Sequence, residues 1–332
     1  MSTFQLAVTI IGIALVFDYI NGFHDAANSI ATIVATRVLS PLQAVAWAAF
    51  FNFAGAFLFG TAVARTVGRG FVNLELVTPF VIMAGLAGAI TWDLITWWLG
   101  LPTSSSHALI GGYAGAATAH AGFRGLILGE WPLTVLFILV APMVGLVSAY
   151  ALMVAVHWIF RYSSPSKMDH YFRRLQLVSS AALSLSHGSN DAQKTAGLIA
   201  GVLYASHYMR TFQIPAWVLM AAYSAIALGT LSGGWRIVHT MGGRLTRLKP
   251  RSGFCAETGA ASAILLATHL GLPVSTTHAI AGAIVGVGSI NRLKAVRWGL
   301  ATDIVWAWVL TIPAAAIIAY LSFLALHFAI GA

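Results

Sequence analysis

The chain has 332 residues, of which 59% are hydrophobic and only 8% are charged. Soluble domains carry about 25% charged residues, so this composition excludes a soluble enzyme. The net charge is +9, but the Lys and Arg residues gather in short loops, where they set membrane orientation, so nucleic acid is not an expected partner. The single cysteine allows no intramolecular disulfide and indicates no redox function.

Apolar runs recur along the chain, and each is about 20 residues long, enough to cross a bilayer as a helix. The N-terminus lacks a positive region and a cleavage site, so we expect the first run to be a membrane helix rather than a signal peptide. The predicted fold class is an all-α polytopic membrane protein with about 10 to 12 membrane segments. In chain order the units are 4–36, 42–63, 76–98, 100–119, 133–160, 177–204, 215–234, 254–270, 272–288 and 299–328.

Two motifs occur twice in the same order. GFHDAANSIA at 22–31 corresponds to GSNDAQKTAG at 188–197, and GLPTSSSHALIGG at 100–112 corresponds to GLPVSTTHAIAGA at 271–283. Internal duplication of this kind is typical of transporters, and an odd number of units per repeat inverts the second copy. We therefore predict a first membrane repeat at 1–160, a cytoplasmic linker at 161–176 and a second, inverted repeat at 177–332.

The distribution of basic residues predicts the orientation. With both termini outside, thirteen Lys and Arg residues fall in the cytoplasmic loops and four in the outer loops. This asymmetry follows the positive-inside rule. The two units that begin with Gly-Leu-Pro are short and rich in Gly and Ser, so they either cross the membrane or re-enter it as hairpins.

Polar residues interrupt the first unit of each repeat. Ionisable groups at this depth mark functional sites, and equivalent broken segments of inverted repeats meet near the bilayer midplane. The structural alternative is a buried ion pair of Lys194 with an aspartate that only holds helices together. We predict that the two clusters face each other and form one functional site, whose candidate residues are Asn21, His24, Asp25, Asn190, Asp191 and Gln193.

The Gly-Leu-Pro motifs predict anion sites. Pro102 and Pro273 suit the first position of a helix. The hydroxyls and unpaired N–H groups that follow would lie at the positive end of a helix dipole, although such hydroxyls also bond to their own backbone. We expect His107 and His278 to orient the hairpins, and we predict no metal site. The predicted anion ligands are Ser104, Ser105, Ser106, Ser275, Thr276 and Thr277.

The four motifs NGFHDAANSIAT, SHGSNDAQKTAGLI, GLPTSSSH and GLPVSTTH resemble those of the Pit family of inorganic phosphate transporters, over nearly the whole chain. The resemblance implies a transporter of inverted repeats in the bacterial inner membrane, usually a homodimer, that moves phosphate with a cation. It implies that Asp25, Asn28, Asn190 and Asp191 surround substrate and cation, while the Ser and Thr residues line the phosphate site.

Two departures concern the coupling ion. His24 and Lys194 stand where sodium-coupled members of the family carry Asn, and such variants resemble the bacterial low-affinity branch, which is regarded as proton-coupled. A Lys ammonium brings its own charge and removes an oxygen ligand, so it should displace sodium. We therefore place Asn28 and Lys194 with the phosphate ligands and assign the six candidate residues of the two clusters to the coupling ion. We expect this ion to be H⁺, with Na⁺ as the alternative and no other cofactor.

The predicted function is phosphate import with protons by alternating access, including import as a metal–phosphate complex. Two ionised aspartates, one Lys and divalent phosphate would leave a large negative charge in low dielectric, so a cation must accompany the anion. The alternatives are a sulfate permease of the same fold, a sodium-coupled phosphate transporter, a divalent-metal transporter and an intramembrane enzyme. The last two leave the duplicated Ser and Thr residues unexplained. Secondary candidates without a counterpart in the other repeat are Asp93, Glu257 and Asp303.

Overall fold

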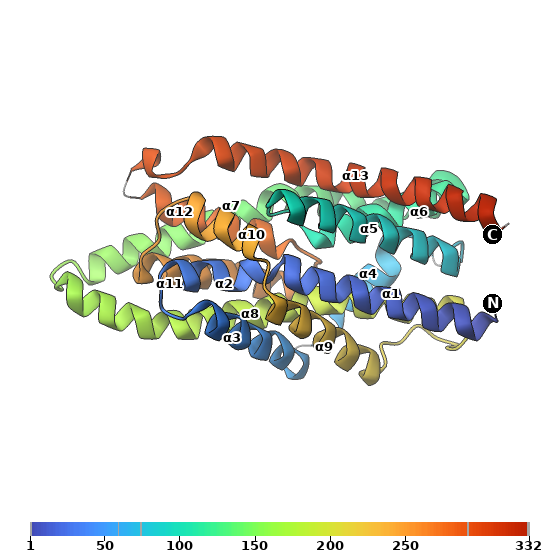
Figure 1. Cartoon of the computed structure of the whole chain (residues 1–332), viewed down its shortest axis with the longest axis horizontal. Helices are drawn as coiled ribbons and strands as arrows, with labels where there is room; N and C mark the ends of the chain where they lie inside the picture. The colour runs from blue at the N-terminus through green and yellow to red at the C-terminus, as the bar shows by residue number, and fades with distance from the viewer. Residues whose placement is uncertain (1, 59, 74, 291, 331–332) are drawn as a thin grey trace.

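The computed structural model describes residues 2–58, 60–73, 75–290 and 292–330. Regular structure in this part of the chain is helical, with one isolated β-bridge between Val72 and Leu126. The helices form an elongated bundle with both termini at one end and the α7–α8 turn at the other (Figure 1). We call these the terminal end and the turn end. The all-α fold class is confirmed.

The helices fall into two series. The first contains α1 (Thr3–His24), α2 (Ala26–Ala35), α3 (Pro41–Ala54), α4 (Ala62–Gly70), α5 (Pro79–Leu99), α6 (Ser105–Ala121) and α7 (Trp131–Ile159). The second contains α8 (Pro165–Ala205), α9 (Ala216–Ser232), α10 (Trp235–Val238), a π-helical turn (His239–Arg244), α11 (Pro250–His269), α12 (Thr276–Ser289) and α13 (Trp298–Ile330). Short 3₁₀ turns occupy Gly55–Phe57, Gly122–Gly125, Leu128–Glu130 and Leu293–Ala295.

Equivalent glycines end α5 and α11. Gly100 and Gly271 have φ angles of +68° and +71°, a left-handed conformation that only glycine adopts without strain. The chain then reverses, so that α5 with α6 and α11 with α12 form two helical hairpins. A left-handed glycine therefore produces the chain reversal in both hairpins.

Several predicted boundaries differ from the observed ones. The unit at 42–63 is broken, because α3 ends at Ala54 and α4 is a separate helix at 86° to it. The linker at 161–176 is helical from Pro165 and belongs to α8, which has 41 residues. Neither Pro102 nor Pro273 begins a helix: α6 and α12 begin three residues later, after capping serines.

Within the described residues, four helical stretches are long and apolar enough to cross a membrane, and six are if each of two bent pairs is one span. The four are Thr3–Ala35, Pro79–Leu99, Trp131–Ile159 and Trp298–Ala329. α6 and α12 have only 17 and 14 residues, short for a crossing. Apolar side chains on the outer faces of α7 and α13 are exposed, as lipid contact requires, among them Leu136, Leu139, Val147, Trp306, Leu310 and Ile317.

The two halves of the chain pack crosswise. α6 makes its most extensive contact with α13, and α12 makes the equivalent contact with α7. α1 packs on α9, and α8 packs on α3. The halves are interlocked as equivalent elements of two repeats.

Two apolar cores lie at the two ends of the bundle. The core of the terminal end includes Ile10, Ile82, Leu109, Ile199 and Ala315. The core of the turn end includes Ile30, Val45, Met153, Cys255 and Ile280. α1 lies with the first core and α2 with the second, so the break between these helices lies where the two cores meet.

We predict that Gly115→Ala lowers the unfolding temperature in detergent by several degrees. A Cβ atom at Gly115 would lie 2.1 Å from the carbonyl oxygen of Ala316, and overpacking of this kind costs about 1–3 kcal/mol. The matched control is Gly201→Ala in α8, where an added Cβ meets nothing within 4 Å. The control should leave the unfolding temperature unchanged or raise it. Equal losses in the two variants would contradict close packing of α6 on α13.

Candidate functional site

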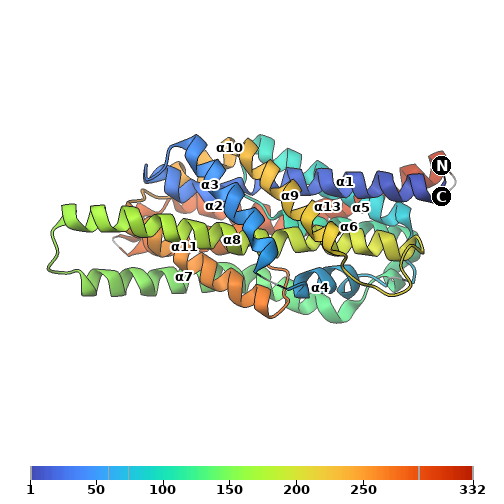
Figure 2. The same ribbon diagram turned by 90° about the horizontal axis from the view of Figure 1, so that it is seen from below.

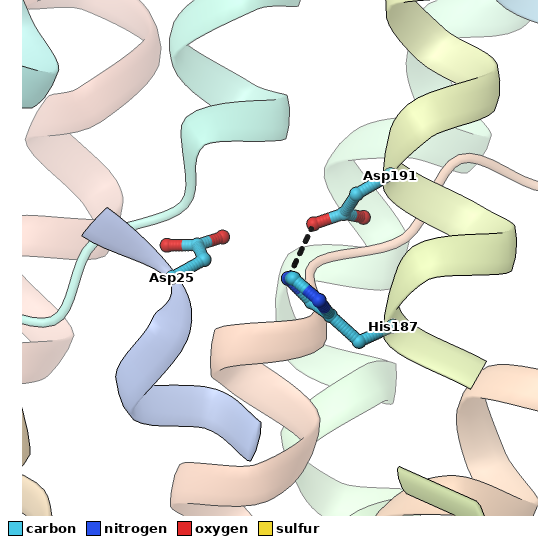
Figure 3. A group of neighbouring side chains, drawn as sticks. All are labelled: Asp25, His187 and Asp191. Atoms are coloured by element: carbon cyan, nitrogen blue, oxygen red, sulfur yellow. Dashed lines mark ion pairs between the residues drawn. The ribbon is translucent and has the colours of Figure 1, made fainter. Parts of the chain in front are cut away.

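The break between α1 and α2 places an acidic side chain between the two cores. Asp25 has φ −90° and ψ 2° and belongs to neither helix. Figure 3 shows its carboxylate directed toward His187 and Asp191 on α8. One ligand atom from each of the three residues lies within 4.8 Å of the other two, and all three residues are buried. The two predicted clusters therefore lie together, and the three side chains are close enough to bind one cation between them.

Lys194 joins α8 to both Gly-Leu-Pro segments. Its Nζ donates a hydrogen bond to Asp191 Oδ1 at 2.5 Å and another to the Val274 carbonyl oxygen at 2.9 Å. It also donates to Ser106 Oγ in the first turn of α6. The ion pair foreseen as the structural alternative is present. The same ammonium also holds the two anion-site segments, so it does more than link two helices.

Asn28 makes the equivalent contact from the first repeat. Its Nδ2 donates to Thr276 Oγ1 at 3.1 Å and to Thr277 Oγ1 at 2.9 Å, in the first turn of α12. Asn28 aligns with Lys194, and Thr277 aligns with Ser106, in the internal repeat. Thr276 Oγ1 then donates to Asp191 Oδ2 at 3.2 Å. Each repeat thus holds the helix N-terminus of the other through an equivalent pair of residues.

His24 and Asn190, which are also equivalent, position the hairpins. His24 Nδ1 lies 2.7 Å from Asp25 Oδ1, and its Nε2 lies 3.1 Å from Thr96 Oγ1 on α5. Asn190 Nδ2 donates to Thr268 Oγ1 at 2.9 Å on α11. Each side chain therefore links one of the two aspartate motifs, at 22–31 and 188–197, to the helix that precedes a Gly-Leu-Pro turn. We call these two segments the signature motifs.

The first turns of α6 and α12 have the geometry of anion sites. Ser104 Oγ accepts from the His107 N–H at 3.2 Å, and Ser275 Oγ accepts from the His278 N–H at 3.1 Å. These two predicted ligands therefore act as N-caps, because a serine hydroxyl satisfies an orphan N–H of the first turn. The N–H groups of the next two residues precede the first intrahelical bond and remain available to an anion.

Two predicted residues lie away from the cluster. Gln193 Nε2 donates to the Ser189 carbonyl at 2.7 Å, and its Oε1 accepts from the Ala64 N–H of α4 at 3.3 Å. It therefore faces α4 rather than the aspartates. Asn21 lies one turn before Asp25, beside Asp18.

Two further acidic side chains are buried in the bundle: Asp18, which the repeated motifs do not mark, and Glu257, a secondary candidate from the sequence. Asp18 is fully buried and accepts a hydrogen bond from Thr195 Oγ1 at 2.9 Å. Glu257, also fully buried, accepts from Thr32 Oγ1 at 2.5 Å and Ser179 Oγ at 2.5 Å. The signal for Asp18 was its position seven residues before Asp25, which puts both on one face of a helix.

Comparisons with known proteins agree with this geometry. A model of the "Phosphate transporter family" matches residues 21–168 and 160–319. A Rhizobium meliloti protein named "Probable low-affinity inorganic phosphate transporter" is 54% identical, with 97% of each chain covered. A Bacillus subtilis protein of the same name is 41% identical over the same shares. A solved structure described as "The sodium-dependent phosphate transporter" matches with a TM-score of 0.90 and 26% identity, covering 98% of this chain and 99% of the other.

We predict that Lys194→Met destabilises the protein by about 3–5 kcal/mol, because it leaves the Asp191 carboxylate buried without its cation. Adding Asp191→Asn to this variant should recover most of the loss, since the unpaired charge is then removed. A double-mutant cycle on thermal unfolding in detergent measures the coupling. Additive effects of the two substitutions would show that the pair does not interact.

Proposed function

The chain belongs to the phosphate transporter family, and on this premise we propose that it imports inorganic phosphate together with protons by alternating access. The observation that carries the proposal is the pair of crosswise contacts, Lys194 to Ser106 and Asn28 to Thr277. They join the first turns of two helices, one from each repeat, to the aspartates. A tetrahedral anion and the cation that is transported with it would then bind at one site.

Neutral and cationic donors converge at the proposed phosphate site. The first turns of α6 and α12 offer backbone N–H groups at the positive ends of two helix dipoles. Ser106, Thr276 and Thr277 add hydroxyls, and all three are buried. Lys194 adds one ammonium. With one full cation, the site attracts the anion without holding it as strongly as a cluster of arginines would.

The charges at this site support proton coupling. Asp25 and Asp191 are buried beside the proposed phosphate position, and Lys194 balances only one carboxylate. Bringing in phosphate adds further negative charge to a medium of low dielectric. Protonation of a carboxylate removes this charge without requiring additional ligands. We assign the coupling role to Asp25 and Asp191.

Sodium coupling is the second candidate, because the solved structure that matches this chain is described as sodium-dependent. The feature that separates the two is Lys194, whose Nζ lies 2.5 Å from Asp191. An ammonium at this distance occupies the position of a small cation on that carboxylate. The proposal therefore favours H⁺ over Na⁺ at Asp191.

In the proposed alternating access, the contacts that change are the crosswise pairs Lys194–Ser106 and Asn28–Thr277. Each hairpin is held through residues of the opposite repeat, so movement of one repeat opens the site toward one end of the bundle. The basic loops of the turn end support an orientation with that end in the cytoplasm and both termini outside. A homodimer in the bacterial inner membrane belongs to the same proposal.

We predict that proteoliposomes with the full chain take up radiolabelled phosphate when an inward proton gradient is applied. An inward sodium gradient alone should give no acceleration, and excess sulfate should not compete. A sulfate site would avoid the carboxylates that can accept the P–OH proton of phosphate. Sodium-driven uptake would transfer the coupling role to Na⁺, and strong inhibition by sulfate would favour the sulfate permease.

Equivalent substitutions at the two helix N-termini should have similar effects. Ser106→Ala and Thr277→Val each remove one hydroxyl that is hydrogen-bonded to Lys194 or Asn28, so each should raise the KM for phosphate about tenfold. The matched control is Ser262→Ala on α11, whose exposed hydroxyl bonds only to the Thr258 carbonyl. An unchanged KM in either site variant would remove that helix from the phosphate site.

A further inference from the structure

A stripe of buried polar residues runs along α1 and α2. Its members are separated by alternating steps of three and four residues, which place them on one helix face. All five are buried: Asp18, Asn21, Asp25, Asn28 and Thr32. The stripe extends beyond the phosphate site in both directions, so binding of phosphate does not account for its full length.

α8 carries a matching stripe. Its members, also buried, are Gln176, Ser180, Ser184, His187, Asp191 and Thr195. The two stripes are joined near both ends. Toward the terminal end Thr195 donates to Asp18 at 2.9 Å, and toward the turn end Thr36 Oγ1 donates to Gln176 Oε1 at 2.9 Å. We call this pair of stripes the polar seam. Figure 2 shows α8 running along most of the length of the bundle.

Asp18 is the carboxyl group of the seam closest to the terminal end. Its exposed fraction is 0%. Oδ1 accepts the hydrogen bond from Thr195, whereas Oδ2 has no hydrogen-bond partner in the part of the chain that the structure describes. A purely structural partner for Thr195 needs only one acceptor oxygen. The second buried oxygen therefore has no structural use here.

Among the described residues, no unpaired cationic side chain faces Asp18. The titratable groups in its electrostatic range are Asp191 and Lys194 on α8 and Tyr223 on α9. Lys194 is already paired with Asp191 at 2.5 Å. An ionised Asp18 would be a buried charge with only the neutral side chains of Thr195 and Asn21 beside it, which costs several kcal/mol. In this arrangement Asp18 is a protonated carboxylic acid.

We infer that Asp18 is a proton-binding site that receives the coupling proton on the terminal side and passes it along the polar seam to the aspartates of the transport site. The inference rests on the proposed proton coupling and adds a site to it. Seven residues of helix place Asp18 about 10 Å along the axis from Asp25. Asn21 lies between them on the same face, and Thr195 lies next to Lys194 on α8.

The proton balance of the step is simple. The O–H bond of Asp18 breaks, an O–H bond forms on the carboxylate of Asp191 or Asp25, and a proton from the terminal side then restores Asp18. When Asp191 becomes neutral, Lys194 loses its anionic partner. Its ammonium is then free to balance phosphate, or Asp18 until the acid is reprotonated. The transfer leaves the total charge of the seam unchanged, because the proton moves from one of its carboxyl groups to another.

The test compares two transport modes of the same reconstituted chain. Asp18→Asn keeps the shape of the side chain and an acceptor for Thr195, but it holds no exchangeable acid proton. We expect proton-driven net uptake to fall about 100-fold. Exchange of internal for external phosphate without a proton gradient should stay within about twofold of the wild type, because the phosphate site itself is intact. The matched control, Asp169→Asn, makes the same change at an exposed carboxyl group of α8 outside the polar seam, so it should retain proton-driven uptake.

The outcomes separate the inference from the proposed function. Wild-type protein that ignores a proton gradient would refute proton coupling itself. With wild-type coupling intact, unchanged net uptake in Asp18→Asn, or equal loss of uptake and exchange, would overturn the role of Asp18. If the Asn variant does not fold, Asp18→Glu and Asp18→Ser replace it. Uptake driven by protons in the Glu variant and in the Ser variant alike would also overturn the inference.

Discussion

The cost of placing charge inside a membrane governs this structure. Lys194 and Asp191 are both buried. Their ion pair is stable at this depth only because further groups satisfy its remaining hydrogen-bond donors and acceptors. Ser106 and the Val274 carbonyl accept the other two hydrogen bonds of the ammonium, and Thr276 donates a hydrogen bond to the carboxylate. Those partners belong to both Gly-Leu-Pro segments. Satisfying one ion pair therefore fixes the positions of both hairpins relative to α8.

The internal symmetry explains why the partners come from opposite repeats, and its exceptions show where function departs from symmetry. Asn28 and Lys194 occupy equivalent positions, yet one is neutral and one is charged. The first signature motif lies at a helix break, whereas the second lies within the continuous helix α8. The break directs the Asp25 carboxylate toward α8 (Figure 3). Two copies of one fold thus provide a pair of unlike carboxylates: Asp25 lies beside His24, whereas Asp191 lies beside both His187 and Lys194.

Much of the site could be predicted from the sequence because duplication marks it. Repeated motifs identified the aspartates and the helix N-termini without knowledge of packing. The remainder depends on contacts that a repeat does not encode. Gln193 lies inside a signature motif but faces α4, and only the packing of α4 on α8 shows this. Pro102 precedes α6 by three residues, because Ser104 caps the helix. Asp18 and Glu257 have no repeated partner, so a search for duplication passes over them.

Lys194 also constrains the coupling ion. A tethered ammonium cannot leave the site during the transport cycle, so a mobile cation must act while that positive charge remains. A metal ion beside Asp191 would need the same oxygen that Lys194 holds at 2.5 Å, together with several further ligands. A proton needs one oxygen and replaces charge on the carboxylate itself. Protonation of Asp191 would free the Lys194 ammonium to pair with the anion. Binding of the proton and binding of phosphate would therefore be linked, because the proton neutralises Asp191 and Lys194 then balances charge on the phosphate. In the proposed function, Asp191 and Lys194 would together provide the charge compensation that a sodium ion and an asparagine would otherwise provide.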